Sequence, residues 1–195
     1  MEFMNSISLY ESLLGEQWDA VSPKVKGGHL SRDSPGGRKL HANCLLDVVG
    51  SSNVIGRIIS RIVGLPAHGK ASSVALHVGE SPEGEIWERI FPDCNLCSVQ
   101  SKSSDGLLVD RFGMIAFHFR LEESDGGIIH HHLKTYLRLG SSGIRLPKCI
   151  SPRVISHEEP DAVEQASRIN VTLSMPLVGH LLSYRGVVMP VREGS

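Results

Sequence analysis

Apolar and polar side chains alternate through much of this chain, most clearly between residues 39 and 49. Successive side chains of a β-strand point to opposite faces of the sheet, so this pattern predicts a strand with one buried face. The same alternation recurs in most of the sequence after residue 70. The apolar positions of the first predicted strand are Leu40, Ala42, Cys44, Leu46 and Val48.

Short segments rich in Gly, Ser, Asp and Pro separate the predicted strands, as at Asp105-Gly106 and at residues 122–127. Such segments are typical of tight turns between antiparallel strands. We expect roughly eight to ten strands, and antiparallel sheets of that size tend to curl, split or close. The sequence predicts an α+β, mostly β fold with residues 1–195 in a single domain. Its centre is a strongly curved antiparallel sheet or a closed or half-closed β-barrel.

Two segments have helical rather than alternating spacing. Residues 54–63 repeat Ile along one helical face after a capping Asn53, with Arg57 and Arg61 outside that face. We expect this Ile-rich helix to pack on or into the barrel and its arginines to face solvent. The other helix is expected over residues 7–20 and ends or bends at Pro23. Its apolar face contains Leu9, Leu13 and Leu14, with Tyr10 and Trp18 at the margin.

The segment 85–91, Glu-Ile-Trp-Glu-Arg-Ile-Phe, contains the most informative pattern in the chain. In an extended strand, Trp87, Arg89 and Phe91 share one face. A guanidinium held between aromatic rings needs an anionic or polar partner when it is buried. Arg89 could pair with a carboxylate on a neighbouring strand, or its bidentate fork could anchor a carboxylate or enolate of a ligand.

Three consecutive histidines at positions 130–132 suggest a metal site, but strand alternation sends neighbouring side chains to opposite faces. Ile129, Leu133 and other odd-numbered positions are apolar, so His131 is predicted to lie on an apolar face. It is then either a core residue with satisfied hydrogen bonds or a general acid or base facing a cavity. His130 and His132 are predicted to face solvent.

Composition and charge narrow the function classes. Lys plus Arg number 20 and Asp plus Glu 21, so no basic excess favours binding to nucleic acid or to a membrane. No apolar run approaches the roughly 20 residues of a spanning helix, and the first residues lack a signal-peptide pattern. We therefore expect a cytoplasmic protein.

The sequence also contains few motifs that would indicate a cofactor. Cys94 and Cys97 have the spacing of half a zinc knuckle, but the second half is missing, so no metal is expected. The sequence contains no glycine-rich dinucleotide fingerprint, no nucleotide-binding P-loop and no Gly-x-Ser-x-Gly elbow. Any chemistry is therefore expected to be acid–base catalysis without a cofactor.

An ordered set of residues resembles a bacterial family of conserved domains of unknown function, although that family more often has Glu than Asp at position 110. The resemblance implies that His29, Trp87, Arg89, Arg111 and Tyr184 belong together. Members occur alone or fused behind oxidoreductase domains of the saccharopine-dehydrogenase or short-chain type, which implies small-molecule metabolism. The matching residues are Leu9-Tyr10, His29, Gly64-Leu65-Pro66, Glu85-x-Trp87-x-Arg89-x-Phe91, Asp110-Arg111-Phe112-Gly113, Glu158 or Glu159, Pro176-x-x-Gly179 and Tyr184-x-Gly186.

Two hypotheses from different classes follow. In the first, the barrel binds a small, largely apolar metabolite and acts as a cofactor-free isomerase, cyclase or lyase in specialised metabolism. Arg89 would hold an oxyanion, and His29 or His131 would move a proton. In the second, the chain is a non-catalytic accessory domain that docks on an oxidoreductase, or a homodimer, with a filled barrel and an exposed apolar patch. The remaining site residues of the first hypothesis are Tyr184 as a proton donor and Trp87, Phe91, Phe117 and Arg111 as the ligand-binding wall.

Overall fold

The computed structural model describes residues 7–30, 39–140, 142–162 and 165–191. Within them the chain forms short helices at its beginning, one helix between the first two strands, and strands from there to the end. The elements are α1 (Leu9–Leu14), α2 (Gln17–Ala20), α3 (Pro23–Lys26), β1 (Lys39–Gly50), α4 (Val54–Ile62), β2 (Gly69–Ser81), β3 (Gly84–Ile90), β4 (Asn95–Lys102), β5 (Leu108–Phe112), β6 (Ile115–Ser124), β7 (Gly127–Leu139), β8 (Ser142–Arg145), β9 (Arg153–Pro160), β10 (Ser167–Met175) and β11 (Gly179–Pro190).

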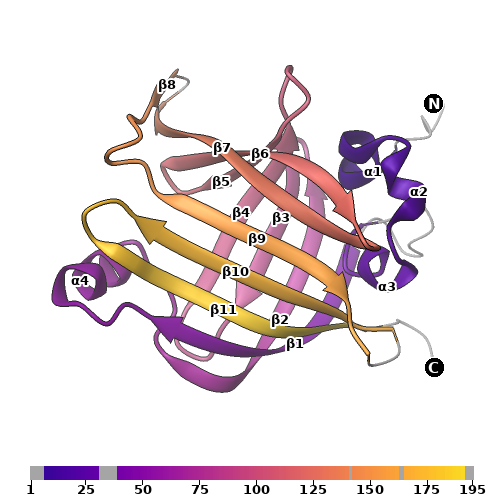
Figure 1. Cartoon of the computed structure of the whole chain (residues 1–195), viewed down its shortest axis with the longest axis horizontal. Helices are drawn as coiled ribbons and strands as arrows, with labels where there is room; N and C mark the ends of the chain where they lie inside the picture. Colours follow the sequence, from indigo (N-terminus) through magenta and orange to yellow (C-terminus); the bar gives the residue numbers. More distant parts are fainter. Residues whose placement is uncertain (1–6, 31–38, 141, 163–164, 192–195) are drawn as a thin grey trace.

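Ten of the strands form a closed antiparallel barrel (Figure 1). Their order is β6-β5-β4-β3-β2-β1-β11-β10-β9-β7, and pairing between β6 and β7 closes the ring. Strand β8 pairs only with β7 and extends outside the ring. Closure leaves no unpaired sheet edge within the ring, which accounts for the stability of so large a sheet. The predicted mostly β fold with a barrel is confirmed.

Helices α1 to α3 form a cap at one end of the barrel (Figure 1). The single helix predicted for residues 7–20 is divided, because Gly15 adopts a φ of 57° that ends α1. Pro23 begins α3 rather than ending the first helix, which corrects that prediction. The cap contributes buried apolar side chains to the barrel end, namely Tyr10, Leu14, Val21, Val25 and Leu30.

Helix α4 lies at the opposite end and forms where the sequence predicts, with Asn53 Oδ1 accepting a hydrogen bond from Gly56 N at 2.6 Å. Its packing does not match the prediction. Ile55, Ile58 and Ile62 have exposed fractions of 63%, 54% and 78%. The expectation that this helix docks in the core through its isoleucines was wrong.

The side of α4 that meets the barrel is built from small residues. Gly56 is buried, and the Ser60 hydroxyl donates to the carbonyl of Leu181 at 3.4 Å. A Cβ on Gly56 would clash with the side chain of Ser51 in the loop that joins β1 to α4, so the packing of the helix on this loop favours glycine. Ile59 is half-buried beside these small residues, whereas Ile55, Ile58 and Ile62 are exposed.

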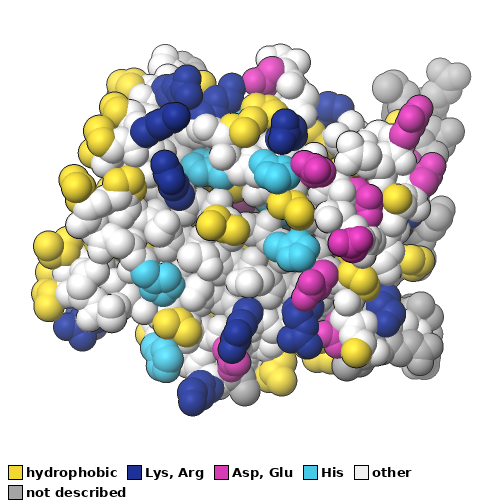
Figure 2. All heavy atoms as spheres, viewed as in Figure 1, with side chains coloured by type: hydrophobic (Ala, Val, Ile, Leu, Met, Phe, Trp, Pro, Cys, Tyr) yellow, Lys and Arg dark blue, Asp and Glu magenta, His cyan; other side chains and the backbone are white. Residues whose placement is uncertain are grey.

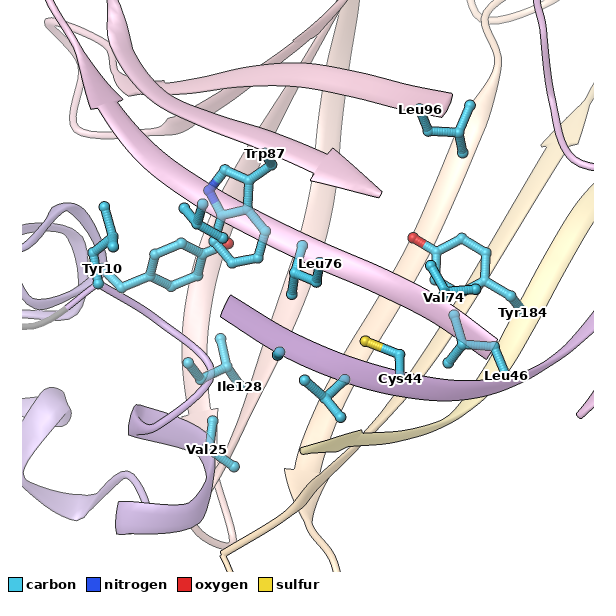
Figure 3. Packing of buried hydrophobic residues seen from close by; sticks show 14 of the residues in the cluster. Tyr10, Val25, Cys44, Leu46, Val74, Leu76, Trp87, Leu96, Ile128 and Tyr184 are labelled. Carbon is cyan, nitrogen blue, oxygen red and sulfur yellow. The ribbon is translucent and has the colours of Figure 1, made fainter. Parts of the chain in front are cut away.

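Buried apolar side chains such as Leu46, Leu76 and Ile128 line the inward face of the barrel (Figure 3). Barrels of about eight strands have interiors just wide enough for side chains to fill, and ten strands enclose more space. Several inward-facing side chains are accordingly only half-buried although they pack against the core. The interior therefore retains accessible space, bordered by Phe112, Phe117, Val154, Val171 and Leu173.

Candidate functional site

Strand β3 brings polar and aromatic side chains into the barrel interior. Its inward positions are Glu85, Trp87 and Arg89, as strand alternation predicts, and Phe91 follows with a buried ring. Cross-strand pairing sets Glu85 opposite Gln100 and Trp87 opposite Ser98. The predicted shared face of Trp87, Arg89 and Phe91 is therefore the inner wall of the barrel.

Arg89 lies at the centre of the interior charges. Its Nη1 donates to Ser98 Oγ at 3.3 Å, and its guanidinium carbon is 5.5 Å from the centroid of the Trp87 ring. Burial raises the pKa of the Asp110 carboxyl on β5, and the nearby Arg89 charge lowers it only in part. Burial likewise raises the pKa of Tyr184, with Arg89 again opposing the shift. The guanidinium thus has a carboxyl group and a phenol as its electrostatic neighbours.

A second part of the network connects the cap to the barrel wall. The Tyr10 hydroxyl donates to Gln100 Oε1 at 3.0 Å and lies 3.3 Å from Nε2 of His130 on β7. Burial lowers the pKa of His130 to about 4, so its imidazole is neutral at physiological pH. A neutral imidazole beside a phenol can accept a proton, and the phenol can donate one.

The third part is an ion pair between the cap and β9. His29 Nε2 lies 2.9 Å from Glu158 Oε2, and Ser167 Oγ donates to Glu158 Oε1 at 2.7 Å. Burial alone would raise the pKa of Glu158, but His29 and Ser167 outweigh it, and the pKa is lowered. The Tyr10 ring packs on His29 with centroids 3.9 Å apart, which places this pair beside the Tyr10–His130 contact.

Six of the eight predicted site residues lie in or against the barrel interior. Two of them pack at the end near α4: Phe91 and Tyr184 have ring centroids 6.1 Å apart. Phe117 lies on the wall of β6, with its centroid 5.8 Å from that of His132. The six are His29, Trp87, Arg89, Phe91, Phe117 and Tyr184.

The other two predicted site residues lie on the outer surface. His131 Nε2 is 2.8 Å from Glu122 Oε2, and Arg111 Nη2 is 3.2 Å from Glu83 Oε2. The predicted inward orientation of His131 was wrong because a β-bulge between His118 and Phe119 shifts the β6–β7 register. Before the shift the even-numbered side chains of β7 face inward, and after it the odd-numbered ones do.

Five residues of the network were not predicted as site residues: Tyr10, Glu85, Asp110, His130 and Glu158. Asp110 carried a signal, because it alternates with Leu108 and Phe112 on what is otherwise an apolar face. The sequence contains no comparable signal for His130. Ile128 and Ile129 lie on opposite faces of β7, so both faces look apolar near this residue.

The described residues contain no group of three His, Cys, Asp or Glu side chains that could hold a metal ion. The two cysteines with knuckle-like spacing are free thiols: Cys94 is half-buried, and Cys97 is exposed. Among the helices of the described ranges, none has the length and apolar character needed to cross a membrane.

Fold and interior together define a closed ten-stranded barrel with a charged network against its helical cap. The chain belongs to the family described as Domain of unknown function (DUF4166), whose model matches residues 23–188. This confirms the family resemblance drawn from the sequence. The matched region includes His29 and all residues of the network on β3 to β9, whereas Tyr10 precedes it. No curated protein and no solved structure matches the chain.

Proposed function

We propose that the barrel binds a small, largely apolar molecule that carries an anionic or carbonyl group. The observation that supports this most directly is the state of Arg89. Arg89 is a half-buried residue on the inner wall, and among the described residues one hydrogen bond, to Ser98, engages its guanidinium. Donors of a planar guanidinium that remain open inside a barrel suit a carboxylate, enolate or carbonyl oxygen.

The surroundings of Arg89 favour an apolar body for this ligand. Half-buried aromatic and aliphatic side chains border the space toward the α4 end, and they include Phe112 and Phe117. Ligand sites in proteins are mostly apolar with a few polar groups that fix orientation. Arg89 would provide that orientation, and the phenol of Tyr184 would lie beside the same group.

A second candidate function, cofactor-free acid–base catalysis as an isomerase, cyclase or lyase, is favoured by the Tyr10–His130 contact. The neutral imidazole of His130 would accept a proton, and the Tyr10 hydroxyl would return one to another position of the ligand. His130 takes the place that the sequence suggested for His131. Docking on an oxidoreductase stays a prediction.

Native mass spectrometry of the freshly purified protein tests the binding proposal, with Arg89→Gln and Arg111→Gln as a matched pair. Both arginines lie on adjoining regions of the wall, but only Arg89 faces inward. We expect a retained small molecule that Arg89→Gln loses and Arg111→Gln keeps. Titration with the fluorescent apolar anion anilinonaphthalene sulfonate gives a second readout, with affinity reduced about tenfold in Arg89→Gln.

Circular dichroism and thermal unfolding show whether each variant is folded. Equal retention by wild type and a folded Arg89→Gln, together with unchanged probe affinity, would remove Arg89 from the site. Loss of binding in Arg111→Gln alone would move the site to the outer surface.

A further inference from the structure

The end of the barrel that carries α4 has an unusual surface, which we call the rim. Its exposed apolar side chains come from α4, from β8 with the loop that follows it, and from the β10–β11 turn. Figure 2 shows hydrophobic side chains along this edge of the molecule, with Lys and Arg beside them. The apolar residues of the rim are Ile55, Ile58, Ile62, Ile144, Ile150 and Leu177, and Leu177 is 97% exposed.

Three separate segments hold these side chains on one end of the molecule. Helix α4 is tied to the β10–β11 turn because Asn53 Nδ2 donates to the carbonyl of Val178 at 2.7 Å. A groove of about 950 Å³ lies between α4 and the end of the barrel, and the exposed side chains of Arg57, Ile58 and Arg61 border it. Strand β8 extends beyond the ring at the same end (Figure 1).

Charge separates sharply between the two ends of the barrel. The connections at the α4 end, residues 51–68, 91–94, 113–114, 142–152 and 176–178, contain four Lys or Arg and one acidic residue. The cap and the connections at its end, residues 7–30, 82–83, 103–107, 125–126 and 161–162, contain two Lys and seven acidic residues. The net charge of −1 conceals this separation, because the +3 of one end offsets much of the −5 of the other. The basic residues at the α4 end are Arg57, Arg61, Arg145 and Lys148, against Asp93.

We propose that the rim docks on an anionic lipid bilayer. An amphipathic helix binds a membrane interface by inserting apolar side chains, and cations at its margin add attraction to anionic lipids. In α4 three isoleucines, at positions 55, 58 and 62, are exposed, and so are the neighbouring Arg57 and Arg61. The acidic cap would then point away from the bilayer. Docking of this kind does not depend on a ligand inside the barrel.

Co-sedimentation with phosphatidylcholine vesicles, prepared with and without phosphatidylglycerol, tests the proposal on the full chain. Wild type should bind only the vesicles with phosphatidylglycerol, and the bound fraction should fall as salt is raised. The triple variant Ile55→Asn/Ile58→Asn/Ile62→Asn should reduce the affinity about tenfold or more. The control is Ile155→Asn, which changes a 70% exposed Ile on the outer wall of β9.

The charges are tested separately with Arg57→Gln/Arg61→Gln against Arg120→Gln/Arg185→Gln, since all four arginines are exposed but only the first two belong to the rim. Only the first pair should weaken binding. Both arginine double variants should keep the wild-type unfolding midpoint, because none of the four changed side chains is buried. Absence of wild-type binding, or equal binding by the triple Ile variant, overturns the proposal. A dimer in sedimentation velocity that the triple variant abolishes, without vesicle binding, assigns the rim to a second copy.

Discussion

The two ends of the barrel carry short amphipathic helices that are used in opposite ways. At the capped end, α1 buries Tyr10 and Leu14, each at most 5% exposed. At the other end, α4 exposes Ile55, Ile58 and Ile62 and contacts β11 through Ser60. An apolar helical face therefore predicts that a helix is amphipathic, but it does not predict which side of the helix packs against the barrel. That choice is made by the side whose shape allows the closer approach.

The difference in packing between α1 and α4 should appear in the unfolding free energy, which one substitution in each helix measures. Leu14→Ala removes a buried side chain, which costs about 3 kcal/mol of unfolding free energy through lost burial and a cavity. Ile62→Ala changes a residue that is 78% exposed and should stay within about 0.5 kcal/mol of wild type. Urea unfolding monitored by circular dichroism gives both values.

A loss of more than about 2 kcal/mol in Ile62→Ala would mean that α4 packs in solution as a core helix. Stability of Leu14→Ala close to wild type would mean that the cap does not close the barrel. Either result would abolish the contrast between the two ends.

The capped end should also give the protein a pH dependence that the α4 end does not. The folded-state pKa of His130 is about 4, below the ordinary value near 6.5, so the unfolded chain takes up a proton first as the pH falls. Stability contributed by the neutral ring is complete above pH 6.5 and declines toward pH 4. Between pH 7 and pH 5 the loss amounts to about 2 kcal/mol.

Urea unfolding at these two pH values, with His130→Gln and His131→Gln, separates the inner wall from the outer one. His130→Gln should remove the largest single part of the decline, and His118 and His132, whose pKa values burial also lowers, account for the rest. His131→Gln should keep the decline, because His131 lies outside and pairs with Glu122. The pKa of Glu158 is lowered, so this carboxyl changes the stability mainly below pH 5 and adds little to the decline between pH 7 and pH 5. A wild-type decline that survives in full in His130→Gln would show that another group causes it.

These adjacent histidines also show where prediction from the sequence succeeds and where it fails. Alternation placed Trp87 and Arg89 on one face of β3 correctly, because no register shift occurs in its pairing with β2 or β4, but it did not tell which face is inward. In β7 the same reasoning selected His131, since the bulge depends on pairing with β6 and leaves no mark in a local window. The fold class followed from turn spacing and alternation, which are local.

Most of the site could not be predicted because it is assembled across the barrel. Tyr10 and His130 meet although 120 positions separate them in sequence, and His29 and Glu158 are separated by 129. Composition and spacing contain no information about such pairs. Asp110 could have been predicted, because it is a carboxylate within an otherwise apolar alternating pattern at β5, and a buried carboxylate needs a partner.

The smallest effect expected from the comparison concerns the caps of the two helices. Asn53→Ala removes the side chain that accepts from Gly56 N, and Ser8→Ala removes the corresponding acceptor for Glu11 N. Each cap is worth about 1 kcal/mol to its helix. Because α1 is packed into the barrel end, Ser8→Ala should lower the global unfolding free energy. Because α4 rests on the barrel by one narrow side, Asn53→Ala should instead open α4 locally.

Hydrogen exchange measured by mass spectrometry distinguishes the two variants. In Asn53→Ala we expect faster exchange confined to residues 54–62, and in Ser8→Ala we expect a uniform increase along the chain. Uniform exchange in both variants would show that α4 unfolds together with the barrel, and its exposed isoleucines would then belong to one cooperative unit with the core.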